Sequence, residues 1–135
     1  MDAAALMDFL AREFPQVHED FAIDSLTAEG VRVRLRVADR HLRPGGTVSG
    51  PSMFALADVA VYLAILARLG PVALAVTTNC SIDFMRKPAR GVDLLCDTRL
   101  LKLGRSLAVG DALLFSEGSD QPVARAGLTY AIPPR

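Results

Sequence analysis

The segment SGPSMFALADVAVYLAILARLG, residues 49–70, is a long apolar run that contains a single acid, Asp58. An ionised carboxylate in an apolar interior is costly unless it is paired or its pKa shifts. A carboxylate in such a place can act as a general base toward water or as a nucleophile toward an acyl carbon. A structural role is the alternative, in which Asp58 accepts hydrogen bonds from a loop or pairs with a distant arginine.

The beginning of the same segment offers a second chemical group. Pro51 suits the first turn of a helix and Ser49 or Gly50 can cap it, so the sequence predicts a helix over about residues 51–69. The free amides at a helix N-terminus favour negative charge. The backbone N–H of Gly50 is therefore a candidate donor to the oxyanion that forms when an acyl carbonyl is attacked.

Gly50 and Asp58 lie too far apart on one helix to act on the same carbonyl. Eight residues separate them, which is about 12 Å along the axis at about 1.5 Å per residue. If both groups take part in one reaction, they come from two copies of the chain. The balance of 15 basic and 15 acidic residues favours such self-association.

The composition predicts one soluble domain over residues 1–135, with 51% hydrophobic and 22% charged residues. The balanced charge gives no indication of a nucleic-acid partner. The segment MDAAALMDFLAREFP lacks the basic start and long apolar stretch of a signal peptide. The apolar run 53–67 is shorter than the roughly 20 residues of a membrane span. We therefore expect a cytoplasmic protein without a membrane partner, with Cys80 and Cys96 as reduced core thiols.

Hydrophobic periodicity predicts an α+β domain that must position these groups. Leu6, Phe9 and Leu10 favour a short amphipathic helix that ends before Pro15. Further along, Val31, Val33, Leu35 and Val37 alternate with Arg32, Arg34 and Arg36, which is typical of a strand with one buried face. A sheet must enclose the long helix, because that helix is apolar on every side. The predicted strands span residues 21–27, 31–37, 72–85, 91–102, 106–116 and 122–132.

One curled antiparallel sheet around a long central helix is the hotdog fold, and the sequence resembles a known family of that fold. The segment GTVSGPSMFALADVAVYLA is similar to the signature of PaaI-type acyl-CoA thioesterases, roughly G-x-x-H-G-G followed by a helix that carries L-A-D. Downstream, SIDFMRKPARG and LKLGRS resemble the family's next two strands and the turn between them. The resemblance covers about residues 30–132.

The resemblance implies an acyl-CoA thioesterase that needs no cofactor. It implies a homodimer in which two sheets join, with two dimers forming a homotetramer. Asp58 would be the general base or the nucleophile, and the N–H of Gly50 from the partner subunit would bind the oxyanion. Thr77 matches a position where the family often has a hydroxyl near the acid, and it would hold the attacking water or orient the carboxylate.

The resemblance also implies residues that bind the substrate. Ser49 stands where the family has His, and Pro51 where it has a second Gly. Arg43, where many members have Asn, could bind a carboxylated acyl group or a coenzyme A phosphate, or close its loop through a salt bridge. Other side chains would follow the pantetheine and nucleotide of coenzyme A or form the wall of the acyl pocket. These candidates are Phe54, Val61, Tyr62, Ile65, Arg86, Lys87, Arg90, Gly104, Arg105 and Ser106.

Three rival functions can be compared with the sequence. A hotdog hydratase would need His five residues after the acid, where this chain has Leu63. A transcription regulator would need a DNA-binding segment, and the N-terminal stretch is too short and too acidic. A non-catalytic protein that binds or senses acyl-CoA is the alternative, because Ser49 and Arg43 could mark a site that binds without turnover. The sequence does not identify the acyl group of the substrate, and acyl carrier protein could replace coenzyme A as its carrier. His18 and His41 are expected to be surface or loop histidines.

Overall fold

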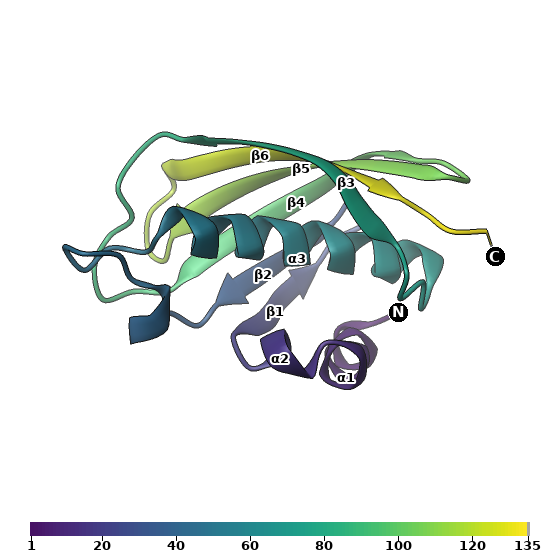
Figure 1. Ribbon diagram of the computed structural model, residues 1–135, viewed down its shortest axis with the longest axis horizontal. Helices are drawn as coiled ribbons and strands as arrows, with labels where there is room; N and C mark the ends of the chain where they lie inside the picture. The colour runs from purple at the N-terminus through teal and green to yellow at the C-terminus, as the bar shows by residue number, and fades with distance from the viewer. Residues whose placement is uncertain (135) are drawn as a thin grey trace.

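The computed structural model describes residues 1–134, which form a six-stranded antiparallel sheet curled around one long helix, α3 (Gly50–Leu69) (Figure 1). The short helices α1 (Ala3–Glu13) and α2 (Pro15–His18) precede the sheet, and the 3-10 helix η1 (Asp39–His41) leads toward α3. The strand order across the sheet is β1-β2-β4-β5-β6-β3, which confirms the predicted hotdog fold. The strands are β1 (Phe21–Leu26), β2 (Val31–Leu35), β3 (Val76–Phe84), β4 (Leu94–Leu103), β5 (Leu107–Ser116) and β6 (Pro122–Ala131).

Helix α3 lies along the concave face of the sheet and forms the centre of the core. It is long and apolar enough to cross a membrane by length and composition, but side chains such as Leu56, Leu63 and Leu66 are fully buried inside the domain. The hydroxyl of Ser49 caps its beginning by accepting the N–H of Ser52 at 3.3 Å. The helix ends at Gly70, whose φ of 86° favours glycine. The observed start at Gly50 is one residue before the predicted one.

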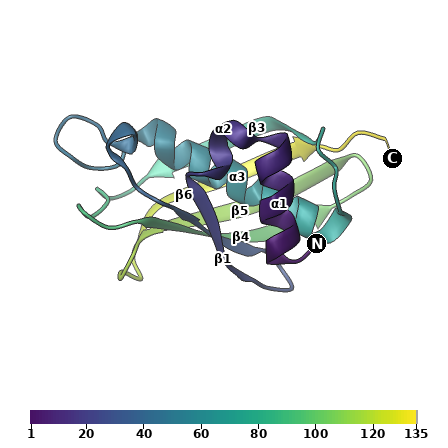
Figure 2. The same cartoon turned by 90° about the horizontal axis from the view of Figure 1, so that it is seen from below.

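Helix α1 covers one side of α3, as Figure 2 shows. Its side chains Leu6, Phe9 and Leu10 are buried, which confirms the predicted amphipathic helix. The terminal ammonium of Met1 donates to the carbonyl of Ala67 at 3.0 Å and ties α1 to the end of α3. The one-turn helix α2 was not predicted, because four residues are too few to show a period.

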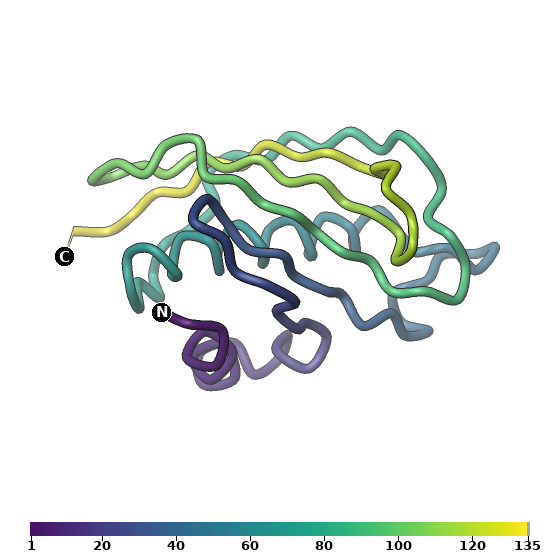
Figure 3. The backbone as a smooth tube through the Cα atoms, turned by 180° about the vertical axis from the view of Figure 1, so that it is seen from behind, coloured from purple at the N-terminus to yellow at the C-terminus, as the bar shows by residue number. Residues whose placement is uncertain are grey.

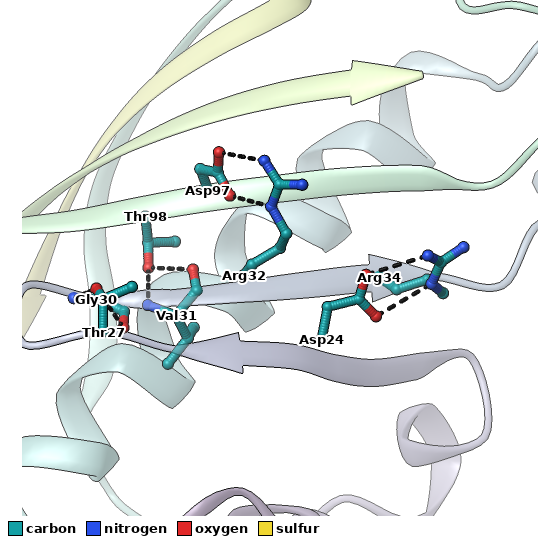
Figure 4. Close-up of polar contacts among 8 residues, drawn as sticks. All are labelled: Asp24, Thr27, Gly30, Val31, Arg32, Arg34, Asp97 and Thr98. Carbon is teal, nitrogen blue, oxygen red and sulfur yellow. Dashed lines mark hydrogen bonds and ion pairs between the residues drawn. The ribbon is translucent and has the colours of Figure 1, made fainter. Parts of the chain in front are cut away.

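The hairpin of β1 and β2 follows the predicted alternation. Val31, Val33 and Leu35 point into the core, and the arginines between them point outward, where Arg32 pairs with Asp97 on β4 (Figure 4). Arg34 pairs with Asp24, Asp93 and Glu117 on the same outer face. Near the hairpin turn, a Cβ on Gly30 would lie 2.0 Å from the carbonyl oxygen of Thr98, so this close approach of two backbones requires glycine.

Two predicted strands begin later than expected. Residues 70–75 form a turn closed by the hydrogen bond from the Ala75 N–H to the carbonyl of Val72, so β3 begins at Val76 and not at residue 72. Residues 86–93 form a loop, so β4 begins at Leu94 and not at residue 91. This loop lies beside the loop 42–48 at one end of the molecule, and the turn between β4 and β5 lies at the opposite end (Figure 3).

Candidate active site

The carboxylate of Asp58 is held by two hydroxyl groups from the sheet. Asp58 is partly buried, on the stripe of α3 that also carries the exposed side chain of Phe54. The hydroxyl of Thr77 on β3 donates to Oδ1 of Asp58 at 2.5 Å. The hydroxyl of Tyr130 on β6 lies 2.6 Å from the same Oδ1 and 2.8 Å from the backbone oxygen of Asp58. These donors compensate for placing a carboxylate in an apolar helix.

Strand pairing brings the two hydroxyls together. Thr77 and Tyr130 are direct partners in the antiparallel pair of β3 and β6, and both point toward α3. A β-bulge between Thr77 and Asn79 shifts the register immediately afterwards. Because a bulge changes the direction of the side chains around it, this irregularity lets Thr77 face the helix. The position of the carboxylate is therefore fixed by two strands as well as by its own helix.

One carboxylate oxygen is occupied and the other is free. Within residues 1–134, all hydrogen bonds to the Asp58 carboxylate end on Oδ1, and Oδ2 has no donor in the protomer. Burial and the nearby charge of Asp58 raise the pKa of Tyr130 above its ordinary value, so its phenol stays a donor. The same two causes raise the pKa of Cys80, which keeps this neighbour a thiol and disfavours it as a rival nucleophile. Oδ2 of Asp58 is therefore the oxygen that is left to meet a ligand or a water molecule.

Tyr130 was missed by the sequence analysis. Two features of the sequence could have indicated Tyr130 as a site residue: its residue type and its position in β6. It is one of only two tyrosines in the chain, and the alternation along β6 places it on the same inner face as Leu128 and Ala126. A buried tyrosine hydroxyl needs a hydrogen-bond partner. The partner itself could not be predicted, because the pairing of Tyr130 with Thr77 depends on a register that only the structure gives.

The helix start presents a free backbone donor. The Ser49 N–H donates to the carbonyl of His41 at 2.8 Å, and the Met53 N–H donates to the carbonyl of Ser49 at 3.0 Å. The N–H of Gly50, between them, has no acceptor in the part of the chain that the structure describes. A Cβ on Gly50 would lie 3.4 Å from the ring of Phe84, an ordinary contact. The donor predicted from the sequence is therefore present and unoccupied.

His41 is buried, which corrects the expectation of a surface or loop histidine. Only 7% of it is exposed, and its ring lies beside Ala38 and Asp20. Its Nδ1 accepts the Ala38 N–H at 2.9 Å, and its Nε2 lies 3.3 Å from Oδ2 of Asp20. Burial opposes ionisation of Asp20, but the hydrogen bond from Arg40 and the nearby ring of His41 outweigh it and lower the pKa of that carboxyl. These contacts of the ring fix the position of His41, whose backbone carbonyl accepts the hydrogen bond from the Ser49 N–H.

A groove at the start of α3 brings several predicted residues together. Loop 42–48, the first turn of α3 and the segment 84–90 surround it, and Gly50 and Phe84 line it. We call it the cationic groove, because its charged side chains are Arg43, Arg86, Lys87 and Arg90. Four basic candidates from the sequence therefore share one groove with the proposed oxyanion donor.

The remaining predicted substrate-binding residues lie outside the cationic groove. Gly104, Arg105 and Ser106 form the turn between β4 and β5, at the end of the protomer opposite the cationic groove (Figure 3). Val61, Tyr62 and Ile65 are buried in the protomer's own core, and the Tyr62 hydroxyl donates to the carbonyl of Ala73 at 3.0 Å. They therefore do not form an open pocket wall in the single protomer. Phe54, 39% exposed, is the one of these four helix candidates that stays on the surface.

A hotdog domain with an acid in its central helix, Leu63 where a hydratase would need His, and a free amide at the helix start fits the class of hotdog thioesterases. The family model of the thioesterase superfamily matches residues 45–123, which include Gly50, Asp58 and Thr77. The chain belongs to this superfamily and is a thioester hydrolase. A curated relative from Pseudomonas aeruginosa, named as an esterase, is 33% identical over 101 residues, covering 75% of this chain and 74% of the relative.

Solved structures agree with this assignment. A crystal structure from Silicibacter sp. TM1040, described as a thioesterase, is 63% identical, covers 99% of this chain and 93% of that one, and has a TM-score of 0.93. The phenylacetic acid degradation protein PaaI of Thermus thermophilus, as a point mutant, is 27% identical over 88% of this chain and 99% of that one, with a TM-score of 0.75. A Streptococcus mutans UA159 protein bound to acetyl CoA is 28% identical over 85% of this chain and 90% of that one, with a TM-score of 0.73.

Proposed function

We propose that the protein hydrolyses acyl-CoA thioesters to a free acid and coenzyme A, with Asp58 as the reacting carboxylate. The observation that carries this proposal is the carboxylate whose Oδ1 is held by Thr77 and Tyr130 and whose Oδ2 is free. The acetyl CoA bound by the Streptococcus mutans neighbour supports coenzyme A as the carrier.

The chemistry follows from the free oxygen of Asp58. In one route, Oδ2 takes a proton from a water molecule whose oxygen forms the new bond to the thioester carbon. In the other route, Oδ2 forms that bond itself, and water then hydrolyses the resulting anhydride. In both routes the carbonyl oxygen becomes an oxyanion, the C–S bond breaks and coenzyme A leaves as a thiolate. The N–H of Gly50 from the partner subunit stabilises the oxyanion.

The proposed dimer is supported by the exposed edge of the sheet. Strand β3 is at one edge, and its side chains Val76 and Phe84 are 57% and 52% exposed. Leu74 and Phe54 are exposed near the same edge and on α3. An apolar, unpaired strand edge favours association with another chain. Pairing of two β3 strands would join the sheets and bring the helix start of one subunit toward Asp58 of the other.

The two groups of basic residues act on one substrate only if two subunits share it. In one protomer, the turn with Arg105 lies at the opposite end from the cationic groove. Arg105 would therefore contact the nucleotide of a coenzyme A substrate whose thioester carbonyl is held by the helix start of the partner subunit. The cytoplasmic location and the dimer of dimers stay predictions.

The proposed function is tested by thiol release from a panel of acyl-CoAs, followed with a thiol reagent. We expect saturable turnover that requires the thioester, with straight-chain and aromatic acyl groups compared at equal concentration. Tight binding of acyl-CoA without thiol release from any member of the panel would instead support the non-catalytic binding or sensing protein. Acyl carrier protein thioesters in the same assay decide between the two carriers.

Replacing Tyr130 with Phe tests the second hydroxyl on Asp58. We expect kcat to fall about tenfold or more and KM to change less than about twofold, because a hydrogen bond to a charged group is lost where the chemistry occurs. Tyr62→Phe is the matched control, since its hydroxyl is also buried but donates to the carbonyl of Ala73. It should lower the melting temperature without lowering kcat. An unchanged kcat in folded Tyr130→Phe, or equal losses of kcat in both variants, contradicts the role of Tyr130.

A further inference from the structure

The four cations of the cationic groove have no carboxylate partner among the described residues, unlike several arginines on the outer face of the sheet. On the outer face of the sheet, Arg32 pairs with Asp97, and Arg125 pairs with Asp83. In contrast, no carboxylate of residues 1–134 lies within salt-bridge distance of the groove's cations, Arg43, Arg86, Lys87 and Arg90. Four cations without a carboxylate partner therefore line one groove, which gives it a positive field that attracts an anion.

The turn that carries Arg43 is closed without the Arg43 side chain. The Arg43 N–H donates to the carbonyl of Thr47 at 2.9 Å, and the Gly46 N–H donates to the carbonyl of Arg43 at 3.0 Å. The guanidinium of Arg90 donates to the carbonyl of Gly45, so that a side chain from the segment 84–90 also holds this turn. The loop-closing salt bridge considered for Arg43 is therefore absent from the described protomer, and its guanidinium is free to bind a ligand.

The place of the groove indicates which part of the substrate carries the anion. The groove includes Gly50, whose N–H is the proposed donor to the thioester oxygen. The phosphates of coenzyme A are separated from that oxygen by the whole pantetheine arm, whereas a group on the acyl chain lies close to it. The groove also contains the apolar side chains of Val48, Met53 and Phe84, which suit a short hydrocarbon chain.

We propose that Arg43 binds a carboxylate at the far end of the acyl group, so that the enzyme acts on monothioesters of dicarboxylic acids. A guanidinium binds a carboxylate through two parallel hydrogen bonds, which gives both affinity and orientation. Arg86 and Arg90 are held by backbone carbonyls and add positive charge around the same groove. This inference rests on the proposed thioesterase function and specifies its substrate class.

The test compares acyl-CoAs of equal chain length with and without the terminal carboxylate, such as glutaryl-CoA against pentanoyl-CoA. We expect the wild type to favour the carboxylated substrate by about tenfold or more in kcat/KM. Arg43→Gln should abolish this preference and change kcat/KM for pentanoyl-CoA less than about threefold. Arg99→Gln is the control, because Arg99 is an exposed arginine on the outer face of the sheet. A preference that is absent in the wild type, or unchanged in Arg43→Gln, overturns the proposal.

Thioesters without phosphate separate the two sources of negative charge. The same acyl groups on N-acetylcysteamine should keep the preference for the carboxylate and its dependence on Arg43. If Arg43→Gln instead weakens both coenzyme A substrates equally and spares the phosphate-free thioesters, Arg43 binds a phosphate and the proposal is wrong.

Failure of the thioesterase function is recognised separately, because the wild type would then hydrolyse no thioester. In that case calorimetric titration with free glutarate decides. Saturable binding that Arg43→Gln abolishes supports a carboxylate site, and absence of binding to the wild type overturns it.

Discussion

Replacement of Asp58 by Asn is expected to lower thioester turnover by about two or more orders of magnitude while the protein stays folded. An asparagine oxygen can still accept the hydroxyls of Thr77 and Tyr130, so the side chain keeps its place. The amide nitrogen then replaces Oδ2, and this group neither takes a proton from water nor attacks an acyl carbon. Thiol release measures kcat and KM, and thermal unfolding measures the melting temperature.

The melting temperature of Asp58→Asn should change little or rise, since a partly buried charge is removed without loss of its hydrogen-bond geometry. Asp111→Asn is the matched control, because Asp111 is an exposed carboxylate on the outer face of the sheet. Its kcat should stay at the wild-type value. Full turnover by a folded Asp58→Asn protein would remove Asp58 from the chemistry and with it the proposed mechanism.

Much of the fold could be predicted because its elements have clear local signals. The alternation of Val31 and Val33 with arginines settles which face of β2 is buried, and the pair Ser49 and Pro51 marks the beginning of α3. A helix that is apolar on all sides has no stable place except inside an enclosing sheet. The largest errors fall at strand beginnings, where turns and loops such as 70–75 are as apolar as the strands that follow them, and β2 ends at Leu35, two residues before the predicted end.

The site was predictable where one segment carries it and hidden where distant segments meet. Asp58 is visible as the single acid of an apolar helix. Its partner Tyr130 is 72 residues away in sequence, and its contact depends on the register of β3 against β6. His41 was misplaced for the same reason, because its burial depends on Asp20 across the fold. Pairing between distant segments is a tertiary property that local patterns do not encode.

The single protomer holds both proposed reacting groups, but too far apart to act on one carbonyl. Gly50 and Asp58 are on one continuous helix, about 12 Å apart along its axis at about 1.5 Å per residue. Neither group can move toward the other without breaking α3, whose sides are buried in the core. A site that uses both groups therefore needs a second chain.

Complementation between two inactive variants is the second large effect that we expect. Gly50→Pro removes the proposed oxyanion donor at a position where proline is favoured, the beginning of a helix, and the preceding Ser49 is already extended, with φ −76° and ψ 158°. We expect turnover to fall about a hundredfold or more. Gly50→Ala is its control, since it keeps the N–H and places its Cβ at an ordinary 3.4 Å from Phe84.

Mixing Gly50→Pro chains with Asp58→Asn chains should restore activity if the site is shared. In a mixed dimer, one site combines the intact Gly50 of one chain with the intact Asp58 of the other, and the second site carries both defects. Random exchange of equal amounts makes half of the dimers mixed, so about a quarter of wild-type activity is expected. Subunit exchange is followed with a mass tag, and circular dichroism and light scattering show that both parents are folded dimers. Complete exchange without recovered activity, or an active wild-type monomer in light scattering, rules out a site made by two chains.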